Sequence, residues 1–252
     1  MISKDIQQRI VSSKRVCVFT GAGVSAESGI PTFRDSGGLW ENYRAEDLVT
    51  PEAFAQDPVV VWRWHAWLQE LSFRAQPNAA HKTIAEMDRA FPDFLLITQN
   101  IDDLHERAGT RRMVKIHGDI MQMSCLDHGH MTHFKEPIGE SSITGQDSLP
   151  KCPICGSMCR PDVVWFGELL PMEPLERARS FCADCDLFLI VGTSGVVSGG
   201  YGFAETAKAS GALIIEVNPE ETALSHLADV TLRSPAAQIV PLLFTNNSYK
   251  NL

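Results

Sequence analysis

The sequence predicts an α/β fold in which a doubly wound parallel sheet carries a second, smaller domain built from two insertions. Short apolar runs alternate along the chain with longer helical stretches, which is the order of a parallel sheet with crossover helices. A glycine-rich loop follows the first apolar run, and polar residues follow a later run where it ends. Two long stretches lack this rhythm and exceed the length of ordinary connections.

Seven apolar runs predict strands, because continuous hydrophobic runs are typical of strands that are covered on both faces. These runs are residues 16–20, 94–99, 114–116, 163–166, 187–192, 213–218 and 230–232. Helices are expected between or before them, at residues 6–13, 58–73, 81–91, 174–182 and 203–210.

Two interruptions of this pattern predict the smaller domain. Residues 31–76 contain aromatic residues and helix signals but no strand signal, and we expect a flap and a helical part there. Residues 121–160 are rich in Gly, Pro, Cys and His. We expect both to pack together, while residues 1–30, 77–120 and 161–252 form the larger domain.

Composition excludes several classes of protein. Of 252 residues, 44% are apolar and 21% are charged, which is typical of a globular chain and excludes a disordered one. The formal net charge of −9 argues against nucleic acid as a partner, because non-specific binding needs a basic surface. No apolar stretch is long enough for a membrane span, and the first residues do not resemble a signal peptide. We therefore expect a cytoplasmic protein, and we also expect a monomer. In a reducing compartment, the paired spacings among the seven cysteines indicate metal or redox sites before disulfides.

The loop after the first strand has the spacing of a dinucleotide-binding turn. Gly21, Ala22 and Gly23 open a G-x-G-x-x-G/A pattern that ends at Ala26. Glycines allow backbone amides to approach a pyrophosphate, and a following helix N-terminus adds partial positive charge. A plain tight turn explains the same pattern, so the loop alone leaves both interpretations open. Glu41 follows at the distance of a ribose-binding acid, but no second strand surrounds it and we exclude it.

Polar residues also end the strand expected at residues 94–99. Ligands of open parallel sheets bind at the carboxyl ends of strands, where amides and carboxylates orient hydroxyls and carboxamides. Helix capping by Asn100 or Asp102 is the alternative. His117 ends the next short strand at the same crevice, and an imidazole with a pKa of about 6.5 can act as a base at neutral pH.

Five segments together resemble the motifs of the sirtuins, a family of NAD-dependent protein-lysine deacylases. They span nearly the whole chain in the family's order, and they are residues 21–34, 98–105, 115–118, 163–168 and 192–194. The resemblance implies a Rossmann-like sheet, NAD as co-substrate, a structural zinc ion, and acylated-lysine proteins or peptides as partners. It also implies 2′-O-acyl-ADP-ribose, nicotinamide and free lysine as products.

The same resemblance assigns roles to residues. It implies that His117 deprotonates a ribose hydroxyl of NAD, with Asn100 as a second catalytic residue. Gln99 then contacts a ribose, Phe33 excludes water, and Arg34 helps to close the flap. The implied NAD-binding residues are Gly21, Ala22, Gly23, Ser25, Phe33, Arg34, Gln99, Asn100, Ile101, Asp102, Gly192, Thr193, Ser194 and Asn218. The implied substrate-binding residues are Val164, Phe166, Gly167, Glu168, His65 and Leu68, with residues 164–168 pairing edge to edge with a peptide.

A zinc site needs four ligands, and the cysteine spacing offers two sets. Cys152 and Cys155 form half of a zinc knuckle. The other half is Cys125 with His128, where the family usually has a second cysteine, or the pair Cys182 and Cys185. Cys185 adjoins a buried apolar run, where a thiol is ordinary core material, so we favour Cys125, His128, Cys152 and Cys155. His130, His133 or Cys159 can replace His128, and loss of the metal is the remaining alternative.

The acyl preference follows from two positions on the helix expected at residues 58–73. Relatives that remove succinyl or malonyl groups carry a Tyr-x-x-Arg pair there, and this chain has His65 and Leu68. Since Leu68 cannot pair with a carboxylate, we expect acetyl or other neutral acyl groups. A second departure is Gly199, which stands where relatives usually have proline.

Two other functions remain as alternatives. The same fold can hydrolyse NAD or transfer mono-ADP-ribose, with nicotinamide released without loss of an acyl group. A non-catalytic NAD- or zinc-dependent interaction module is the other, and the net charge and His117 argue against it.

Overall fold

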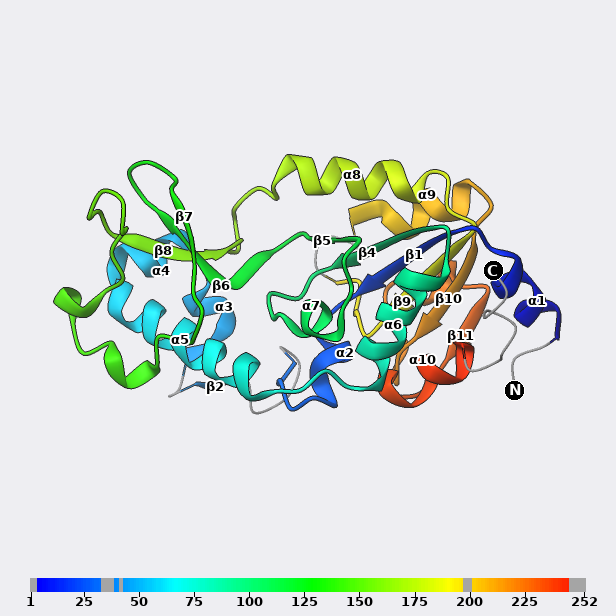
Figure 1. The fold of residues 1–252 in the computed structure, drawn as a ribbon, viewed down its shortest axis with the longest axis horizontal. Coiled ribbons are helices and arrows are strands. Elements are labelled where there is room, and N and C mark those ends of the chain that lie inside the picture. Colours follow the sequence, from blue (N-terminus) through cyan, green and yellow to red (C-terminus); the bar gives the residue numbers. More distant parts are fainter. Residues whose placement is uncertain (1–3, 33–38, 41–42, 197–200, 245–252) are drawn as a thin grey trace.

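The structure is a computed structural model of residues 1–252, and it describes residues 4–32, 39–40, 43–196 and 201–244. The chain forms two lobes, with the larger lobe built around a parallel sheet (Figure 1). Its strands are β1 (Arg15–Thr20), β4 (Asp93–Thr98), β5 (Met113–Lys115), β9 (Leu187–Val191), β10 (Leu213–Val217) and β11 (Val230–Leu232). Their order is β11-β10-β9-β1-β4-β5, with every neighbouring pair parallel.

Helices cover both faces of this sheet. The side chains of each strand alternate between the two faces, and both faces are apolar, so each needs a layer of helices to bury it. Val16 and Val18 face α1 (Lys4–Ser12), α6 (Ala79–Ala90) and α10 (Ala236–Phe244). Cys17 and Phe19 face α8 (Met172–Cys182) and α9 (Phe203–Ala209). Figure 1 shows the two layers on opposite sides of the sheet. The doubly wound sheet predicted from the sequence is therefore confirmed.

The smaller lobe combines segments from both interruptions. Helices α3 (Ala45–Leu48), α4 (Pro51–Gln56) and α5 (Pro58–Arg74) share one apolar cluster with an antiparallel sheet of β6 (Gly118–Cys125), β7 (Met131–His133) and β8 (Cys159–Val163). Asp57 caps α5 by accepting from the amides of Val59 and Val60. Trp62 of α5, fully buried, donates to the carbonyl of Cys159 and ties the helix to β8.

Two sequence predictions about strands are wrong. The strand expected at residues 163–166 ends at Val163, because a turn follows it: the amide of Glu168 donates to the carbonyl of Trp165, and Gly167 has a φ of 87°. Residues 31–76, which were expected to lack strands, contain a short antiparallel hairpin. Its strands, β2 (Leu39–Trp40) and β3 (Tyr43–Arg44), have two residues each. The remaining short elements are α2 (Gly23–Ala26), α7 (Leu104–Ala108), η1 (Glu140–Ser142), η2 (Gln146–Ser148) and η4 (Ser225–Leu227).

Candidate functional site

Polar side chains from two neighbouring strands meet at the carboxyl edge of the large sheet. Ser25 follows β1 and is 1% exposed, and its hydroxyl donates to Asp102 after β4 at 2.9 Å. The amide of Asn100 donates to the same hydroxyl at 3.1 Å. Asp102 also accepts from the amide of Leu104, so it caps α7 as well. Burial raises the pKa of Asp102, although these hydrogen bonds oppose the shift. The carboxylate of Asp102 is thus bonded both to Ser25 and to the first amide of α7.

The glycine loop packs directly against the loop that follows β9. The amide of Gly23 donates to the carbonyl of Gly192 at 2.9 Å, and that of Gly21 to Val191 at 3.1 Å. Gly192 has a φ of 61°, and a Cβ there would lie 2.5 Å from the amide nitrogen of Val24. Glycine is therefore required for the two loops to approach each other. Ala22 lies between the two glycines, at the start of α2.

Side chains from two further strands complete this edge. The hydroxyl of Thr193 donates to Oε1 of Gln99 at 2.7 Å, and its carbonyl accepts from Nδ2 of Asn218 at 3.0 Å. Ser194 accepts the amide of Ala223 on its carbonyl. The structure thus brings the predicted residues after β1, β4, β9 and β10 together. Their buried hydroxyls, amides and carboxylate fit a ligand that is rich in hydroxyl groups and carries a carboxamide, as NAD does.

His117 lies between the two sheets, after β5 of the larger lobe and before β6 of the smaller one. Its Nδ1 is 2.9 Å from the carbonyl oxygen of Gln99, which can only accept, so Nδ1 carries the proton. Burial lowers the pKa of His117, and the imidazole is neutral at neutral pH. Nε2 is therefore the basic nitrogen. Gly118, with a φ of 84°, allows the chain to turn closely past the carbonyl of Asp162.

Tyr201 is a site residue that the sequence analysis missed. Its hydroxyl is 2.6 Å from Nε2 of His117. A single tyrosine in a glycine-rich stretch carries no chemical pattern, so no signal in the sequence pointed to it.

Two further histidines, both buried, lie against the polar cluster at the edge of the sheet. His81 and His105 are buried, with ring centres 4.7 Å apart. Nε2 of His105 is 3.2 Å from the hydroxyl of Thr20, and Nε2 of His81 is 3.4 Å from that of Ser25. Burial lowers the pKa of His81 to about 4, and it also lowers the pKa of His105 well below its ordinary value. Both rings are neutral hydrogen-bonding groups at physiological pH.

A compact group of metal-ligand side chains lies in the smaller lobe. Ligand atoms of Cys125, His130, Cys152 and Cys155 all lie within 4.8 Å of one another. The closest pairs, Cys125 with Cys155 and Cys152 with His130, are 3.5 Å apart. A tetrahedral zinc site with Zn–S bonds of about 2.3 Å has sulfur atoms about 3.8 Å apart, so the donor set and spacing fit zinc.

His130 takes the place that the sequence analysis expected for His128. The amide of Cys125 donates to the carbonyl of His130, which sets the two residues opposite each other across a tight turn. His128 lies exposed at the tip of that turn. The rival thiols are elsewhere: Cys182 lies in the core of the larger lobe, 3.9 Å from the sulfur of Cys17, and Cys185 is buried beside it. Hydrogen bonds with Ser157 lower the pKa of Cys155 to about 6, which favours the thiolate that zinc binds.

The predicted substrate segment is joined directly to His117. The amide of Val164 donates to the carbonyl oxygen of His117 at 2.9 Å. Phe166 is 45% exposed, with its amide bonded to Val49. Glu168 is engaged within the chain, because both of its oxygens accept from the guanidinium of Arg160.

The remaining predicted residues are placed as follows. His65 is fully buried on α5. Leu68, on the same helix, is partly buried against the apolar cluster of the smaller lobe. Ile101 is partly exposed, and its carbonyl accepts the amide of Ile120. Phe33 and Arg34 lie outside the described residues, and so does Gly199.

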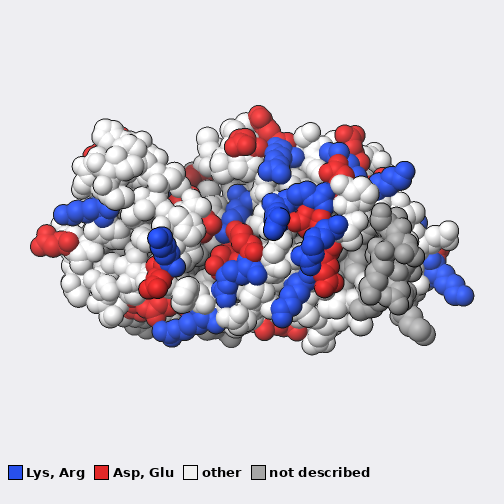
Figure 2. Space-filling model, in the orientation of Figure 1, with Lys and Arg blue, Asp and Glu red and all other residues white. Residues whose placement is uncertain are grey.

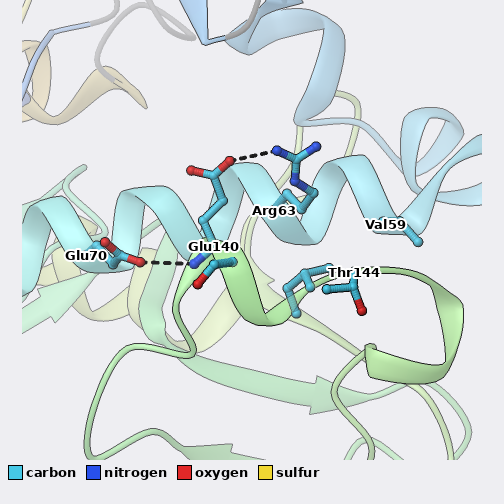
Figure 3. A pocket seen from close by; sticks show the side chains of 7 residues that line it. Val59, Arg63, Glu70, Glu140 and Thr144 are labelled. Carbon is cyan, nitrogen blue, oxygen red and sulfur yellow. Dashed lines mark hydrogen bonds and ion pairs between the residues drawn. The ribbon is translucent and has the colours of Figure 1, made fainter.

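One cleft in the smaller lobe is separate from this site. It has a volume of about 720 Å³ and lies between α5 and η1, lined by Val59, Arg63, Glu70, Glu140, Ser141, Ile143 and Thr144. Arg63 forms an ion pair with Glu140 at 2.9 Å, and Glu70 accepts the backbone amide of Glu140 (Figure 3). Its charges are thus used within the chain, and no predicted site residue lines it.

The surface of the larger lobe carries charged side chains of both signs. Acidic and basic side chains are intermixed over the larger lobe on the face shown in Figure 2. Within the described part of the chain, no helix has the length and apolar character needed to cross a membrane.

Comparison with known proteins gives a consistent result. Residues 21–199 match the profile described as the Sir2 family. A relative from Thermococcus kodakarensis, named NAD-dependent protein deacylase, is 47% identical over 89% of this chain and 88% of its own. A crystal structure of a Sir2 homologue in complex with NAD covers 100% of this chain and 95% of its own, with 43% identity and a TM-score of 0.91. A mutant Sir2 homologue in complex with 2′-O-acetyl ADP-ribose covers 96% and 95%, with 43% identity and a TM-score of 0.89.

Proposed function

Because the chain belongs to the Sir2 family, we propose that it removes acyl groups from protein lysines and consumes NAD in the reaction. Bound NAD supplies the ribose to which the acyl group passes, so the products are nicotinamide, 2′-O-acyl-ADP-ribose and free lysine. The observation that carries this proposal is the neutral imidazole of His117 beside the polar edge formed by Ser25, Asn100 and Asp102. This edge holds the dinucleotide.

His117 is the general base. The bond from Nδ1 to the carbonyl of Gln99 sets the tautomer, so that Nε2 carries the lone pair that accepts from a ribose hydroxyl once this hydroxyl has replaced that of Tyr201. The lowered pKa keeps this nitrogen unprotonated at neutral pH. Asn100 and Asp102 hold the nicotinamide, and Gln99 and Asn218 orient the loops around the ribose. Phe33 and Arg34 belong to the flap that covers it.

The acylated peptide lies along the segment from Val164 to Glu168. Support comes from the direct bond between Val164 and the carbonyl of His117, which joins this segment to the base. Peptide binding through backbone groups tolerates many sequences, as an enzyme acting on many proteins requires. His65 and Leu68 offer no positive charge to an acyl carboxylate, so acetyl and other neutral acyl groups are the substrates.

The metal serves the structure of the smaller lobe. Four protein ligands leave no open position for a substrate, so a zinc ion held by Cys125, His130, Cys152 and Cys155 stabilises the sheet of β6 and β8. The proposed enzyme is a cytoplasmic monomer. Its free cysteines fit a reducing compartment.

Mass spectrometry of acetyl-lysine peptides, with and without NAD, tests the proposal. We expect loss of the acyl group only with NAD, together with equal amounts of nicotinamide and acetylated ADP-ribose. Release of nicotinamide without deacylation would instead identify an NAD hydrolase or an ADP-ribosyl transferase.

A further inference from the structure

One guanidinium group holds the turn that follows β8. Arg160, within β8, donates to both carboxylate oxygens of Glu168, at 2.5 and 2.9 Å. It also donates to the carbonyl oxygen of Val163 at 3.0 Å. The central carbon of the guanidinium lies 3.5 Å from the ring centre of Trp165. A single side chain thus contacts the last residue of the strand and two residues of the turn.

The carboxylate of Glu168 closes the same turn from its other end. It accepts the backbone amide of Trp165 at 2.9 Å, while the amide of Glu168 donates to the carbonyl oxygen of Trp165 at 3.0 Å. Burial opposes ionisation of Glu168, but the hydrogen bonds from Arg160 and Trp165 lower its pKa, so the side chain is a carboxylate at neutral pH. Both of its oxygens are used within the chain.

This arrangement needs an arginine rather than any positive charge. A planar guanidinium binds both oxygens of one carboxylate and can stack on an aromatic ring at the same time, whereas the ammonium of lysine is a point charge. The side chains of Arg160 and Glu168 are 20% and 26% exposed, so water screens the pair only in part. The conformation of the turn therefore depends on the shape of the Arg160 side chain.

The turn is continuous with the proposed peptide-binding segment. The amide of Val164 donates to the carbonyl of His117, and the amide of Phe166 donates to that of Val49. These bonds fix the start and the middle of the segment, and the guanidinium fixes its end at Glu168. A peptide that binds along a segment already held in one conformation pays less entropy to order it.

We infer that Arg160 is a positioning residue for the acylated peptide, which holds residues 164–168 in the conformation that the peptide binds; this inference rests on the proposed deacylase function. Glu168 is then the partner of Arg160 and does not itself contact the peptide, although the family resemblance implied that it binds substrate. Neither side chain contacts the reacting atoms.

Two single variants test the role of Arg160. Arg160→Lys keeps the charge but loses the planar fork, and Glu168→Gln loses the charged partner. For each variant, we expect KM for an acetyl-lysine peptide to rise roughly 10-fold, the usual contribution of a hydrogen bond to a charged group. The calorimetric affinity for the same peptide without NAD should fall by the same factor.

The two variants should leave the chemical step in place. We expect kcat and KM for NAD to change little, because the bond between His117 and Gln99 and the polar edge that holds NAD are untouched. An unchanged KM for the peptide would overturn the inference. A loss confined to kcat or to NAD affinity would do the same.

The double variant separates a partner from a second contact. If Glu168 acts only through Arg160, Arg160→Lys with Glu168→Gln raises KM for the peptide no further than the larger single effect. If Glu168 also touched the peptide, the two effects would multiply, and the assignment of Glu168 as a partner would be wrong.

Arg15→Lys is the matched control. Arg15 also forms an ion pair, with Asp93 at 2.6 Å, and also lies over an aromatic ring, 4.2 Å from the ring centre of Phe181. It lies at the opposite edge of the large sheet, where β1 and β4 begin. We expect this variant to keep the wild-type KM for the peptide.

Hydrogen exchange in the wild-type protein decides if the variants fail to fold. The amides of Trp165 and Glu168 are expected to exchange slowly before any peptide is added, because the turn is already formed. Fast exchange that slows only with peptide would show that the peptide orders the turn, and would overturn the inference. If the wild-type protein does not deacylate the peptide with NAD, the proposed function fails, and calorimetry and exchange still decide this inference.

Discussion

The hydroxyl of Tyr201 and Nε2 of His117 lie 2.6 Å apart. Since Nδ1 of His117 donates to the carbonyl of Gln99, the tyrosine O–H is the donor in this contact. The lone pair of the proposed base is thus engaged by the chain itself, and a substrate hydroxyl must replace the tyrosine. Tyr201 has a φ of 61°, in the left-handed region that residues other than glycine seldom adopt.

Replacing Tyr201 by phenylalanine is expected to move the pH profile. The base acts in its neutral form, so activity falls as the pH drops through the pKa of His117. A donor to Nε2 stabilises the neutral form, and its removal raises this pKa toward its ordinary value. The acid limb of log kcat/KM against pH should therefore shift to higher pH in Tyr201→Phe. An unchanged acid limb would show that this hydrogen bond is absent in the working enzyme.

Replacing His117 by alanine is expected to lower kcat on acetyl-lysine peptides by about 10² to 10⁴ fold, the usual contribution of a positioned base. NAD affinity, measured by calorimetry, should change little, because the polar contacts of Ser25, Asn100 and Asp102 remain. His226→Ala, in η4, serves as the control for loss of a histidine. Turnover retained in His117→Ala would exclude the role of base.

Zinc content is expected to distinguish the two candidate histidines of the knuckle. His130→Ala removes a ligand and should lower both the bound zinc, measured by atomic absorption, and the Tm. His128→Ala should leave both unchanged, because this side chain is exposed at the turn. The opposite pattern would restore His128 as the ligand.

Two glycine substitutions separate backbone strain from a clash at the site. Gly192→Ala and Gly211→Ala both place a side chain at positive φ, which costs about 1 to 2 kcal/mol. Only Gly192 meets the glycine loop, whereas a Cβ at Gly211 has nothing within 4 Å. We expect the free energy of unfolding to fall further in Gly192→Ala, and NAD affinity to fall in that variant alone. Equal effects on unfolding and binding would mean that the two loops do not need this close approach.

Local patterns in the sequence were sufficient for most of the large sheet. The run at β9 is apolar throughout, and those at β1, β4 and β10 are largely apolar, because both faces of these strands are covered. That pattern can be recognised without knowledge of the neighbouring strands. The turn after Val163 was missed because Val164, Trp165 and Phe166 have strand propensity. The hydrogen bond between Glu168 and Trp165 overrides that propensity.

By itself, the sequence determined the parallel sheet, the glycine loop beside polar strand ends, and the family to which these motifs belong. The tertiary structure alone brought His130 rather than His128 to the three cysteines, and brought Tyr201 to His117. Periodicity and glycine spacing depend on residues close together along the chain. Which side chains meet depends on turns and packing between segments far apart in it, and those distances exist only after folding.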